Sequence, residues 1–206
     1  MNPEASLTVL LCVLAYFLGS VPFGYLAAKV AGLDITQKGS GNTGATNVLR
    51  TLGPQYAVPV LAMDLAKGAI SAYLGLRFTG MGVLGALLVG AFAVAGHNWS
   101  VFLRFRGGKG VASSAGVVLV AFPLLLLVAF GVFVFIVLVT RYVSLGSLLA
   151  AWTAVALSFT PGYGLTAQIP VIILAGFITY QHRSNIKRLM TGTELKISFG
   201  KGSASR

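Results

Sequence analysis

The sequence contains few charged residues, and very few of those are acidic. Of 206 residues, 9% are charged, and four Asp and Glu stand against 15 Lys and Arg, which gives a formal net charge of +11. A soluble domain has about 25% charged residues. Because 56% of the residues are hydrophobic and the mean hydropathy is +0.87, the composition excludes a soluble domain and predicts an all-α protein embedded in a membrane.

Cysteine and clustered carboxylates are also scarce, which excludes several kinds of site. The single cysteine, Cys12, can form neither an intrachain disulfide nor a thiolate metal cluster. The acidic residues are far apart, so we expect no metal ion, no cofactor and no hydrolysis by two carboxylates; they are Glu4, Asp34, Asp64 and Glu194. The positive charge does not indicate nucleic-acid binding, because the basic residues lie between hydrophobic stretches.

Hydrophobic stretches divide the chain into seven predicted membrane-spanning helices. A bilayer core of roughly 30 Å needs about 20 helical residues, and the stretches are residues 7–30, 56–76, 81–96, 111–122, 124–140, 143–159 and 169–180. The fourth and fifth could instead form one long tilted helix, interrupted only by Pro123. We expect the first stretch to be retained, because no basic residue precedes it as in a cleavable signal peptide.

The distribution of Lys and Arg decides between six and seven spans. With seven spans and the N-terminus outside, the outer loops carry only Arg77, whereas Arg141 and the basic residues after 180 lie inside. Six spans would place Arg141 and those residues outside, against the excess of positive charge on cytoplasmic loops. The sequence therefore predicts a cytoplasmic C-terminus, a single domain over residues 1–206, and a flexible basic tail over residues 192–206.

Nearly all residues capable of chemistry lie in three short polar segments, which this topology places together on the cytoplasmic face. They cover residues 38–50, 104–114 and 181–188, and none of them contains Asp or Glu. Glycine frees backbone N–H groups, and hydroxyl, amide and basic side chains all favour negative oxygens. The three polar segments are therefore predicted to form one site for anions.

The first polar segment has three glycines in six residues, and their N–H groups can converge on an anion. Arg50 can grip a phosphate through two parallel hydrogen bonds. An ordinary flexible loop is the alternative, but it does not explain so many donors in so short a stretch. The other candidate ligands in this segment are Gly39, Ser40, Gly41, Asn42, Thr43, Gly44 and Asn47.

The second polar segment runs through Gly107, Gly108, Lys109 and Gly110 directly into an apolar helix. The N-terminus of a helix attracts anions through its dipole and its free N–H groups. The segment is not a nucleotide-binding P-loop, because Leu103 stands where a glycine is required and no Ser or Thr follows the lysine. The alternative is a basic loop that only fixes the topology.

The third polar segment continues the last hydrophobic stretch. At helical spacing His182 and Asn185 share one face and Arg183 and Lys187 share another, so one face can point into a site and the other toward lipid phosphates. A basic signal that stops membrane insertion is the alternative. That alternative does not explain the pairing of His182 with Asn185.

Other polar residues lie between these segments. Ser144 and Ser147 are two alternatives for one further hydroxyl ligand, beside Arg141. Asp64 and Lys67 lie one helical turn apart and are expected to neutralise each other within the second span. Residues 97–99, His-Asn-Trp, fit an interfacial belt at the end of the third span.

The lack of carboxylates near the histidines excludes familiar acyl-transfer sites. Phe102 lies five residues after His97, and Lys187 lies five after His182, so the His-x4-Asp pair of acyl-coenzyme A glycerolipid acyltransferases is missing. A Ser-His-Asp triad lacks an evident carboxylate partner. Any reaction must therefore use a substrate that is already activated. An acyl phosphate is a mixed anhydride with a lipid-soluble tail, and it meets this requirement.

The polar segments resemble the three signature motifs of the bacterial acyl-phosphate:glycerol-3-phosphate acyltransferase family. The matching residues are 39–50, 107–112 and 182–189, and the similarity extends over the whole chain, including residues 64–68 and 140–147. The resemblance implies an enzyme of the bacterial inner membrane with seven spans. It would transfer a fatty acyl group from acyl phosphate to the 1-hydroxyl of sn-glycerol 3-phosphate, giving lysophosphatidic acid and inorganic phosphate. We expect a monomer that interacts with its two substrates and the bilayer.

The resemblance also implies roles for individual residues. Acyl phosphate would lie against Ser40, Asn42, Thr43 and the turn 107–110, and glycerol 3-phosphate would be held by Arg50, Lys109, His182, Asn185 and either Ser147 or Ser144. Catalytic roles are expected for Ser40, Arg50, Lys109, His182 and Asn185. The remaining substrate contacts are expected from Gly39, Gly41, Asn42, Thr43, Gly44, Asn47, Arg104, Gly107, Gly108, Gly110, Ser144, Ser147 and Arg183. The general base is left open between His182 and a phosphate oxygen of a substrate.

A membrane carrier for small organic phosphates is the alternative function, because cationic loops among helices would serve it too. Against it, the basic residues cluster on one face instead of lining both ends of a path, and no inverted repeat is apparent.

Overall fold

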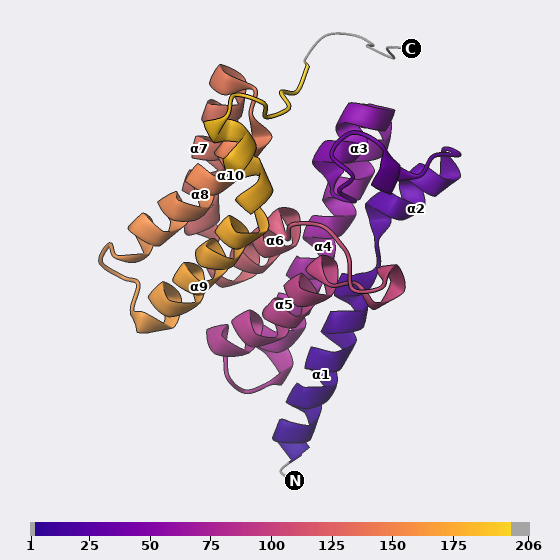
Figure 1. Ribbon diagram of the computed structural model, residues 1–206. Helices are drawn as coiled ribbons and strands as arrows, with labels where there is room; N and C mark the ends of the chain where they lie inside the picture. Colours follow the sequence, from indigo (N-terminus) through magenta and orange to yellow (C-terminus); the bar gives the residue numbers. More distant parts are fainter. Residues whose placement is uncertain (1–2, 199–206) are drawn as a thin grey trace.

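The computed structural model describes residues 3–198, which form a bundle of helices (Figure 1). Within that range there is no strand, and the isolated bridge joins Ser100 to Arg106, so the predicted all-α fold is confirmed for these residues. The α-helices are α1 (Pro3–Ser20), α2 (Phe23–Val30), α3 (Ala45–Leu52), α4 (Pro54–Phe78), α5 (Val83–Asn98), α6 (Val111–Ala121), α7 (Pro123–Thr140), α8 (Val143–Ser158), α9 (Leu165–Gln181) and α10 (Arg183–Met190). Two short 3-10 helices are η1 (Ile35–Gln37) and η2 (Val101–Leu103).

The helices begin and end close to the predicted hydrophobic stretches. Among residues 3–198, three apolar stretches are long enough to cross a membrane, namely Pro3–Val30, which combines α1 and α2, Pro54–Phe78 and Pro123–Thr140. Four further apolar helices, α5, α6, α8 and α9, are shorter. The count of seven spans and the outside N-terminus stay predictions, because length alone does not assign the shorter helices.

The outer surface of the bundle carries large apolar side chains. On α7, Leu124, Leu127, Phe135 and Val139 are each more than 60% exposed. Such a surface would be unstable in water, since each side chain loses roughly 1.5–3 kcal/mol of burial free energy. Lipid is therefore the natural surrounding of α7.

The first predicted span is not one helix. We expected a single stretch over residues 7–30, but α1 ends at Ser20 and α2 begins at Phe23. Pro22 causes the break, because it has no N–H group to donate and its ring clashes with the preceding turn of a helix. Two carbonyl oxygens at the break are used by other elements. Ser100 Oγ donates to Ser20 O at 2.6 Å, and Lys67 Nζ donates to Val21 O at 3.1 Å.

The fourth and fifth predicted spans are two helices rather than one. Between α6 and α7, Phe122 leaves the helical conformation with φ −147° and ψ 71°. Pro123 then occupies the first turn of α7, where a missing N–H group does no harm. The expectation of a break at Pro123 is therefore confirmed.

Figure 1 shows the helices in two groups, with α1, α4, α5 and α6 in one and α7, α8 and α9 in the other. Glycine permits the closest approaches within the first group. A Cβ atom at Gly19 of α1 would overlap the backbone of Ala93 in α5, and one at Gly96 of α5 would overlap the backbone of Tyr16 in α1. Small residues commonly play this part where membrane helices pack together.

Residues 192–198 follow a defined path, although we expected a flexible tail over residues 192–206. Ile197 is buried, and its N–H group donates to Arg141 O at 3.0 Å. Lys196 Nζ lies 5.1 Å from the centre of the Tyr142 ring, and Glu194 is buried. These contacts show that residues 192–198 are held against the bundle. Residues 199–206, the rest of the expected flexible tail, lie outside the described part of the chain.

Replacing Gly19 with Ala is expected to lower the free energy of unfolding by about 1–3 kcal/mol, because the added methyl group would meet the Ala93 backbone. Gly131→Ala in α7 is the matched control, since a Cβ atom there would have nothing within 4 Å. The control should lose no stability, because Ala is favoured over Gly inside a helix by up to about 1 kcal/mol. Unfolding of both variants in detergent measures the difference, and equal losses would contradict the tight contact of α1 with α5.

Candidate active site

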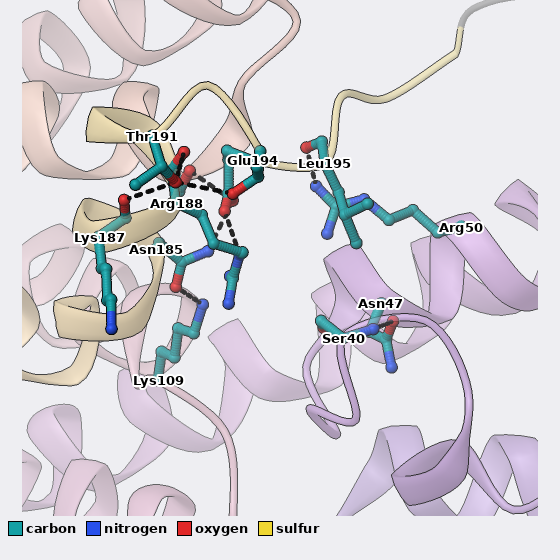
Figure 2. A network of polar contacts seen from close by, with 12 residues as sticks. Ser40, Asn47, Arg50, Lys109, Asn185, Lys187, Arg188, Thr191, Glu194 and Leu195 are labelled. Carbon is teal, nitrogen blue, oxygen red and sulfur yellow. Dashed lines mark hydrogen bonds and ion pairs between the residues drawn. The ribbon is translucent and has the colours of Figure 1, made fainter.

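The three polar segments meet at one end of the bundle, as predicted. Asn42 Nδ2 in the first segment donates to Gly107 O in the second at 3.4 Å. Lys109 Nζ in the second donates to Asn185 Oδ1 in the third. Arg50 Nη2 donates to Leu195 O at 2.7 Å, just beyond the third segment (Figure 2). Segments far apart in the sequence therefore share one site.

Asn47 holds the first polar segment in shape. Its Oδ1 accepts a hydrogen bond from Ser40 N at 2.9 Å, and its Nδ2 donates to Asn42 O at 2.9 Å and to Lys38 O at 3.0 Å. We expected Asn47 to contact a substrate directly. Because its amide atoms are engaged within the segment, the structure instead makes Asn47 a support for the loop that carries the exposed Ser40.

The turn formed by residues 107–110 rests on the end of α5 and begins α6. Gly108 N donates to His97 O at 3.0 Å, and Ser114 N donates to Gly110 O at 2.7 Å. Gly110 precedes α6 in the left-handed conformation, with φ 78°, and no side chain caps the N-terminus of α6. A helix N-terminus without a cap offers N–H groups and a positive dipole to an anion. Lys109 adds a charge at the same place.

Glu194 lies among the basic residues of the site (Figure 2). Its Oε1 accepts hydrogen bonds from Asn185 Nδ2 at 2.6 Å and from Ser144 Oγ at 2.8 Å, and its Oε2 pairs with Arg188 Nε at 2.7 Å. We predicted neither Glu194 nor Arg188 as a site residue, because we expected a site without a carboxylate. A single acidic residue in an otherwise basic stretch was the available signal.

Burial and neighbouring charges change the ionisation of these groups. Burial, helped by the charges of Arg188 and Arg50 and opposed by Glu194, lowers the pKa of Lys109 to about 8. Burial also lowers the pKa of Arg50, whose Nε is buried without a hydrogen-bond partner among residues 3–198. Burial raises the pKa of Glu194, but its three hydrogen bonds outweigh this and hold the pKa below its usual value. Three cations thus face one carboxylate, and two positive charges remain unbalanced.

His182 is neutral at neutral pH and has one ring nitrogen free to accept a hydrogen bond. Burial first, and then the charge of Lys109, lower the pKa of His182 to about 4. Its Nδ1 lies 2.8 Å from Ile178 O, and a carbonyl oxygen can only accept, so Nδ1 carries the proton. His182 and Asn185 are buried together, which confirms that they share the inward face.

Two predicted ligands are exposed to solvent. Arg183 is exposed, donates to Tyr180 O at 3.1 Å, and stacks 4.5 Å from the centre of the Tyr180 ring. Arg104 is exposed and has a left-handed backbone with φ 53°. Among residues 3–198, neither side chain forms a hydrogen bond or ion pair with a polar residue of the three segments, so their direct contact with a substrate stays a prediction.

The two candidate serines have different surroundings. Ser144 Oγ donates to Glu194, whereas Ser147 Oγ returns to Val143 O of its own helix at 2.9 Å. Ser147 also lines the apolar cavity described below. The structure therefore joins Ser144 to the charged cluster and leaves Ser147 at its border.

Residues 97–99 are not an interfacial belt as a group. Trp99 is 43% exposed, but His97 and Asn98 are only 8% and 3% exposed. His97 Nδ1 lies 3.4 Å from Asp64 Oδ1, and Lys67 Nζ lies 2.8 Å from the same oxygen. The expected pairing of Asp64 with Lys67 is confirmed, and the expected surface position of His97 and Asn98 is wrong because both turn inward from the last turn of α5.

An apolar cavity of about 80 Å³ begins beside the polar site and extends between α6, α7, α8 and α9. Val111, Ser114 and Ser147 line one end, and Val118, Ala154 and Val171 line the other. Seven residues of α8 separate Ser147 from Ala154, so the cavity is roughly 10 Å long at 1.5 Å per helical residue. A cationic site and an apolar cavity side by side suit a molecule with an anionic head and a hydrocarbon tail.

Comparison with known proteins identifies the family. The sequence profile of the family described as glycerol-3-phosphate acyltransferase matches residues 9–192. The chain belongs to the glycerol-3-phosphate acyltransferase family. The glycerol-3-phosphate acyltransferase of Thermoanaerobacter sp. is 46% identical over 190 residues, which cover 92% of this chain and 95% of that protein. That of Desulforudis audaxviator is 47% identical over 201 residues, which cover 96% of this chain and 100% of that protein.

Two solved structures of the family resemble this acyltransferase closely. Both are crystal structures of PlsY (YgiH), an integral membrane glycerol 3-phosphate acyltransferase, and both are 40% identical to this chain. The glycerol 3-phosphate form has a TM-score of 0.88 and covers 93% of this chain and 96% of that one. The lysophosphatidic acid form has a TM-score of 0.85 and covers 93% and 95%. This acyltransferase is accordingly an integral membrane protein, as its composition predicts.

Lys109 should make anion binding by this acyltransferase depend on pH. Its pKa is about 8, and a bound dianion raises that value by favouring the charged form. The added affinity is therefore fully present below pH 8 and is lost as pH rises above 8. The Kd for glycerol 3-phosphate, used as a phosphate monoester probe, should stay constant from pH 7 to 7.5 and weaken about fivefold to tenfold by pH 9.

Lys109→Arg is the matched control for this dependence, because an arginine does not titrate in this range. Its Kd should change less than about twofold between pH 7 and 9. A wild-type Kd that is equally flat would show that Lys109 does not contribute its charge to the anion site.

Proposed function

We propose that this protein transfers a fatty acyl group from acyl phosphate to the 1-hydroxyl of sn-glycerol 3-phosphate, giving lysophosphatidic acid and inorganic phosphate. The observation that carries the proposal is the cluster of Arg50, Lys109 and Arg188 around Glu194, beside an apolar cavity. Membership of the acyltransferase family supports the activity. The forms of the related structures, glycerol 3-phosphate and lysophosphatidic acid, name an acceptor and a product that fit this site.

The charged cluster suits glycerol 3-phosphate. A phosphate monoester carries roughly −1.5 to −2 charges at pH 7, which matches the two positive charges that Glu194 leaves unbalanced. Arg50 Nε has no hydrogen-bond partner among residues 3–198, and the charge of Arg50 acts on Lys109. We assign the phosphate of the acceptor to Arg50 and Lys109, and its hydroxyl groups to His182 and Asn185.

The acyl phosphate fits between the first polar segment and the turn 107–110. The turn leads into the N-terminus of α6, and Asn42 links the two segments through Gly107 O at 3.4 Å. From there the acyl chain would enter the apolar cavity past Val111 and Ser114. We therefore assign the phosphate of the donor to Ser40, Asn42, Thr43 and the glycine turn, with Gly39, Gly41 and Gly44 shaping the loop around it.

The reaction requires little from the side chains beyond orientation and charge. The 1-hydroxyl oxygen attacks the carbonyl carbon of the acyl phosphate, a new C–O ester bond forms, and the C–O bond to phosphate breaks. Lys109 and the N–H groups of the turn offset the negative charge that develops. Phosphate has a second pKa of about 6, whereas His182 has a pKa of about 4. A phosphate oxygen is therefore the stronger base, and His182 is assigned to hold the hydroxyl through its Nε2.

We also infer the finer topology from charge. Seven spans with the N-terminus outside place the three polar segments, Arg141 and the tail on the cytoplasmic side, in accord with the positive-inside rule. The bacterial sources of the relatives support a cytoplasmic membrane location. A single chain supplies all three segments of the site, which supports a functional monomer.

Purified protein given palmitoyl phosphate and glycerol 3-phosphate is expected to release inorganic phosphate only when both are present. Lys109→Ala should lower kcat/KM for glycerol 3-phosphate at least about 100-fold, because it removes a buried charge that faces the acceptor. Lys187→Ala is the matched control and should stay within about twofold, since Lys187 is exposed and extends away from Glu194 (Figure 2). Phosphate release without glycerol 3-phosphate, or no release in a folded preparation, would contradict the proposal.

Filling the far end of the cavity is expected to shift the preference for donor chain length. Ala154→Leu should lower kcat/KM for palmitoyl phosphate about tenfold while changing that for octanoyl phosphate less than about threefold, because only the longer chain needs the far end. Ala156→Leu is the control, since Ala156 is exposed on the same helix. Equal losses for both donors would show that the acyl chain does not lie in this cavity.

A further inference from the structure

Three ionisable side chains are buried together outside the cluster around Glu194. Asp64 and Lys67 in α4 are each 2% exposed, and His97 closes the group from α5. Asp64 Oδ1 lies 2.8 Å from Lys67 Nζ and 3.4 Å from His97 Nδ1, as charge pairs whose angles are poor for hydrogen bonds. Removing such groups from water is expensive, and a buried pair is rarely worth more than an apolar one to stability. Their presence in a membrane helix points to a role beyond packing.

One side of this group reaches the first polar segment through the break between α1 and α2. Lys67 Nζ donates to Val21 O at 3.1 Å, at the point where Pro22 interrupts the helix. The helix that follows, α2, approaches the first polar segment so closely that a Cβ atom at Gly24 would overlap the backbone of Thr43. Lys67 thus fixes the junction from which that segment is positioned.

The other side of the group reaches the glycine turn. Gly108 N donates to His97 O at 3.0 Å. A Cβ atom at Gly108 would overlap the His97 ring at Nε2, and one at Gly107 would overlap His97 O. The imidazole ring therefore lies between Asp64, at its Nδ1 edge, and the turn, at its Nε2 edge.

The neighbouring residue extends this support to the start of α6. Asn98 is 3% exposed, and neither of its side-chain amide atoms has a hydrogen-bond partner among residues 3–198. It lies against Gly110, where a Cβ atom would be 2.8 Å from Asn98 Nδ2. The end of α5 thus underlies the turn along its whole length.

A turn made of three glycines and one lysine has little conformational preference of its own. If nothing supported it, each ligand would have to order the turn on binding and would bind more weakly for that reason. The His97 ring provides a rigid surface against which the turn has one position.

We propose that His97, fixed by Asp64, is a positioning residue that sets the conformation of the turn 107–110 and thereby the affinity for the acyl-phosphate donor. The proposal rests on the function proposed above and adds the residues that prepare its donor site. Of the acceptor ligands only Lys109 belongs to the turn, and its Nζ is held by Asn185 Oδ1 of α10. Arg50, His182 and Asn185 form no hydrogen bond or ion pair with His97 among residues 3–198, so the affinity for the acceptor should change much less than that for the donor.

Steady-state kinetics in both substrates test the proposal. His97→Ala removes the ring, and KM for palmitoyl phosphate is expected to rise about tenfold or more, while KM for glycerol 3-phosphate stays within about twofold. Asp64→Asn keeps the size of the side chain and leaves His97 in place but less firmly held. In this variant KM for palmitoyl phosphate should rise about threefold, while KM for glycerol 3-phosphate stays within about twofold. Asp64→Asn therefore tests the proposal even if His97→Ala does not fold.

A second measurement needs no turnover. Amide hydrogen exchange at residues 107–110 should be at least about tenfold faster in both variants than in the wild type, because the turn loses its support. Ser71→Ala is the matched control, since Ser71 is also buried in α4 but its Oγ bonds to Lys67 O of its own helix at 2.8 Å. It should change neither KM nor exchange in the turn.

The outcomes separate the two proposals. If both KM values rise together, or if the variants only lose folded protein with unchanged KM and exchange, His97 has a general structural role and the positioning proposal is overturned. If wild-type protein transfers no acyl group, the proposed function fails, and exchange at the turn alone decides whether His97 positions it.

Discussion

The site depends on one carboxylate set among partly buried cations. Arg50, Lys109 and Arg188 come from distant parts of the chain, and their charges repel one another. Glu194 offsets this repulsion and also binds Asn185 and Ser144, so it ties the third polar segment to the start of α8. The backbone oxygen of the following residue, Leu195, accepts a hydrogen bond from Arg50 of α3. Without this carboxylate the cationic groups would lack the common partner that holds them in a partly dry space.

Glu194 leaves enough positive charge for the site to remain attractive to anions. A fully neutralised cluster would have no preference for phosphate, and an unneutralised one would be costly to bury. The balance of three cations and one carboxylate lies between these limits. The apolar cavity beside the cluster suits the hydrocarbon part of a lipid substrate, and the cluster suits its charged part. The two environments meet near Ser147.

Features that depend on near neighbours in the chain could be predicted from the sequence, whereas features that depend on distant residues could not. Hydrophobic patterning and Pro123 placed the helices, and helical spacing put His182 and Asn185 on one buried face, because these properties depend on near neighbours. Pro22 was passed over within an apolar run. The roles of Glu194 and His97 depend on Ser144 and Asp64, which lie far away in the chain. The role of Asn47 could not be predicted, because an amide that holds a loop and one that binds a substrate look alike in the sequence. The site residues that depend on packing could be found only in three dimensions.

The placement of Glu194 has a consequence for biogenesis. The ribosome delivers Arg50 and Lys109 to the membrane long before residues 192–198, which follow α9 and α10 in the chain. Until then the emerging bundle carries its cations without their carboxylate. Residues 192–198 therefore close the cluster late in synthesis, and a newly made chain becomes competent to hold its substrates only after α9 and α10 have been made.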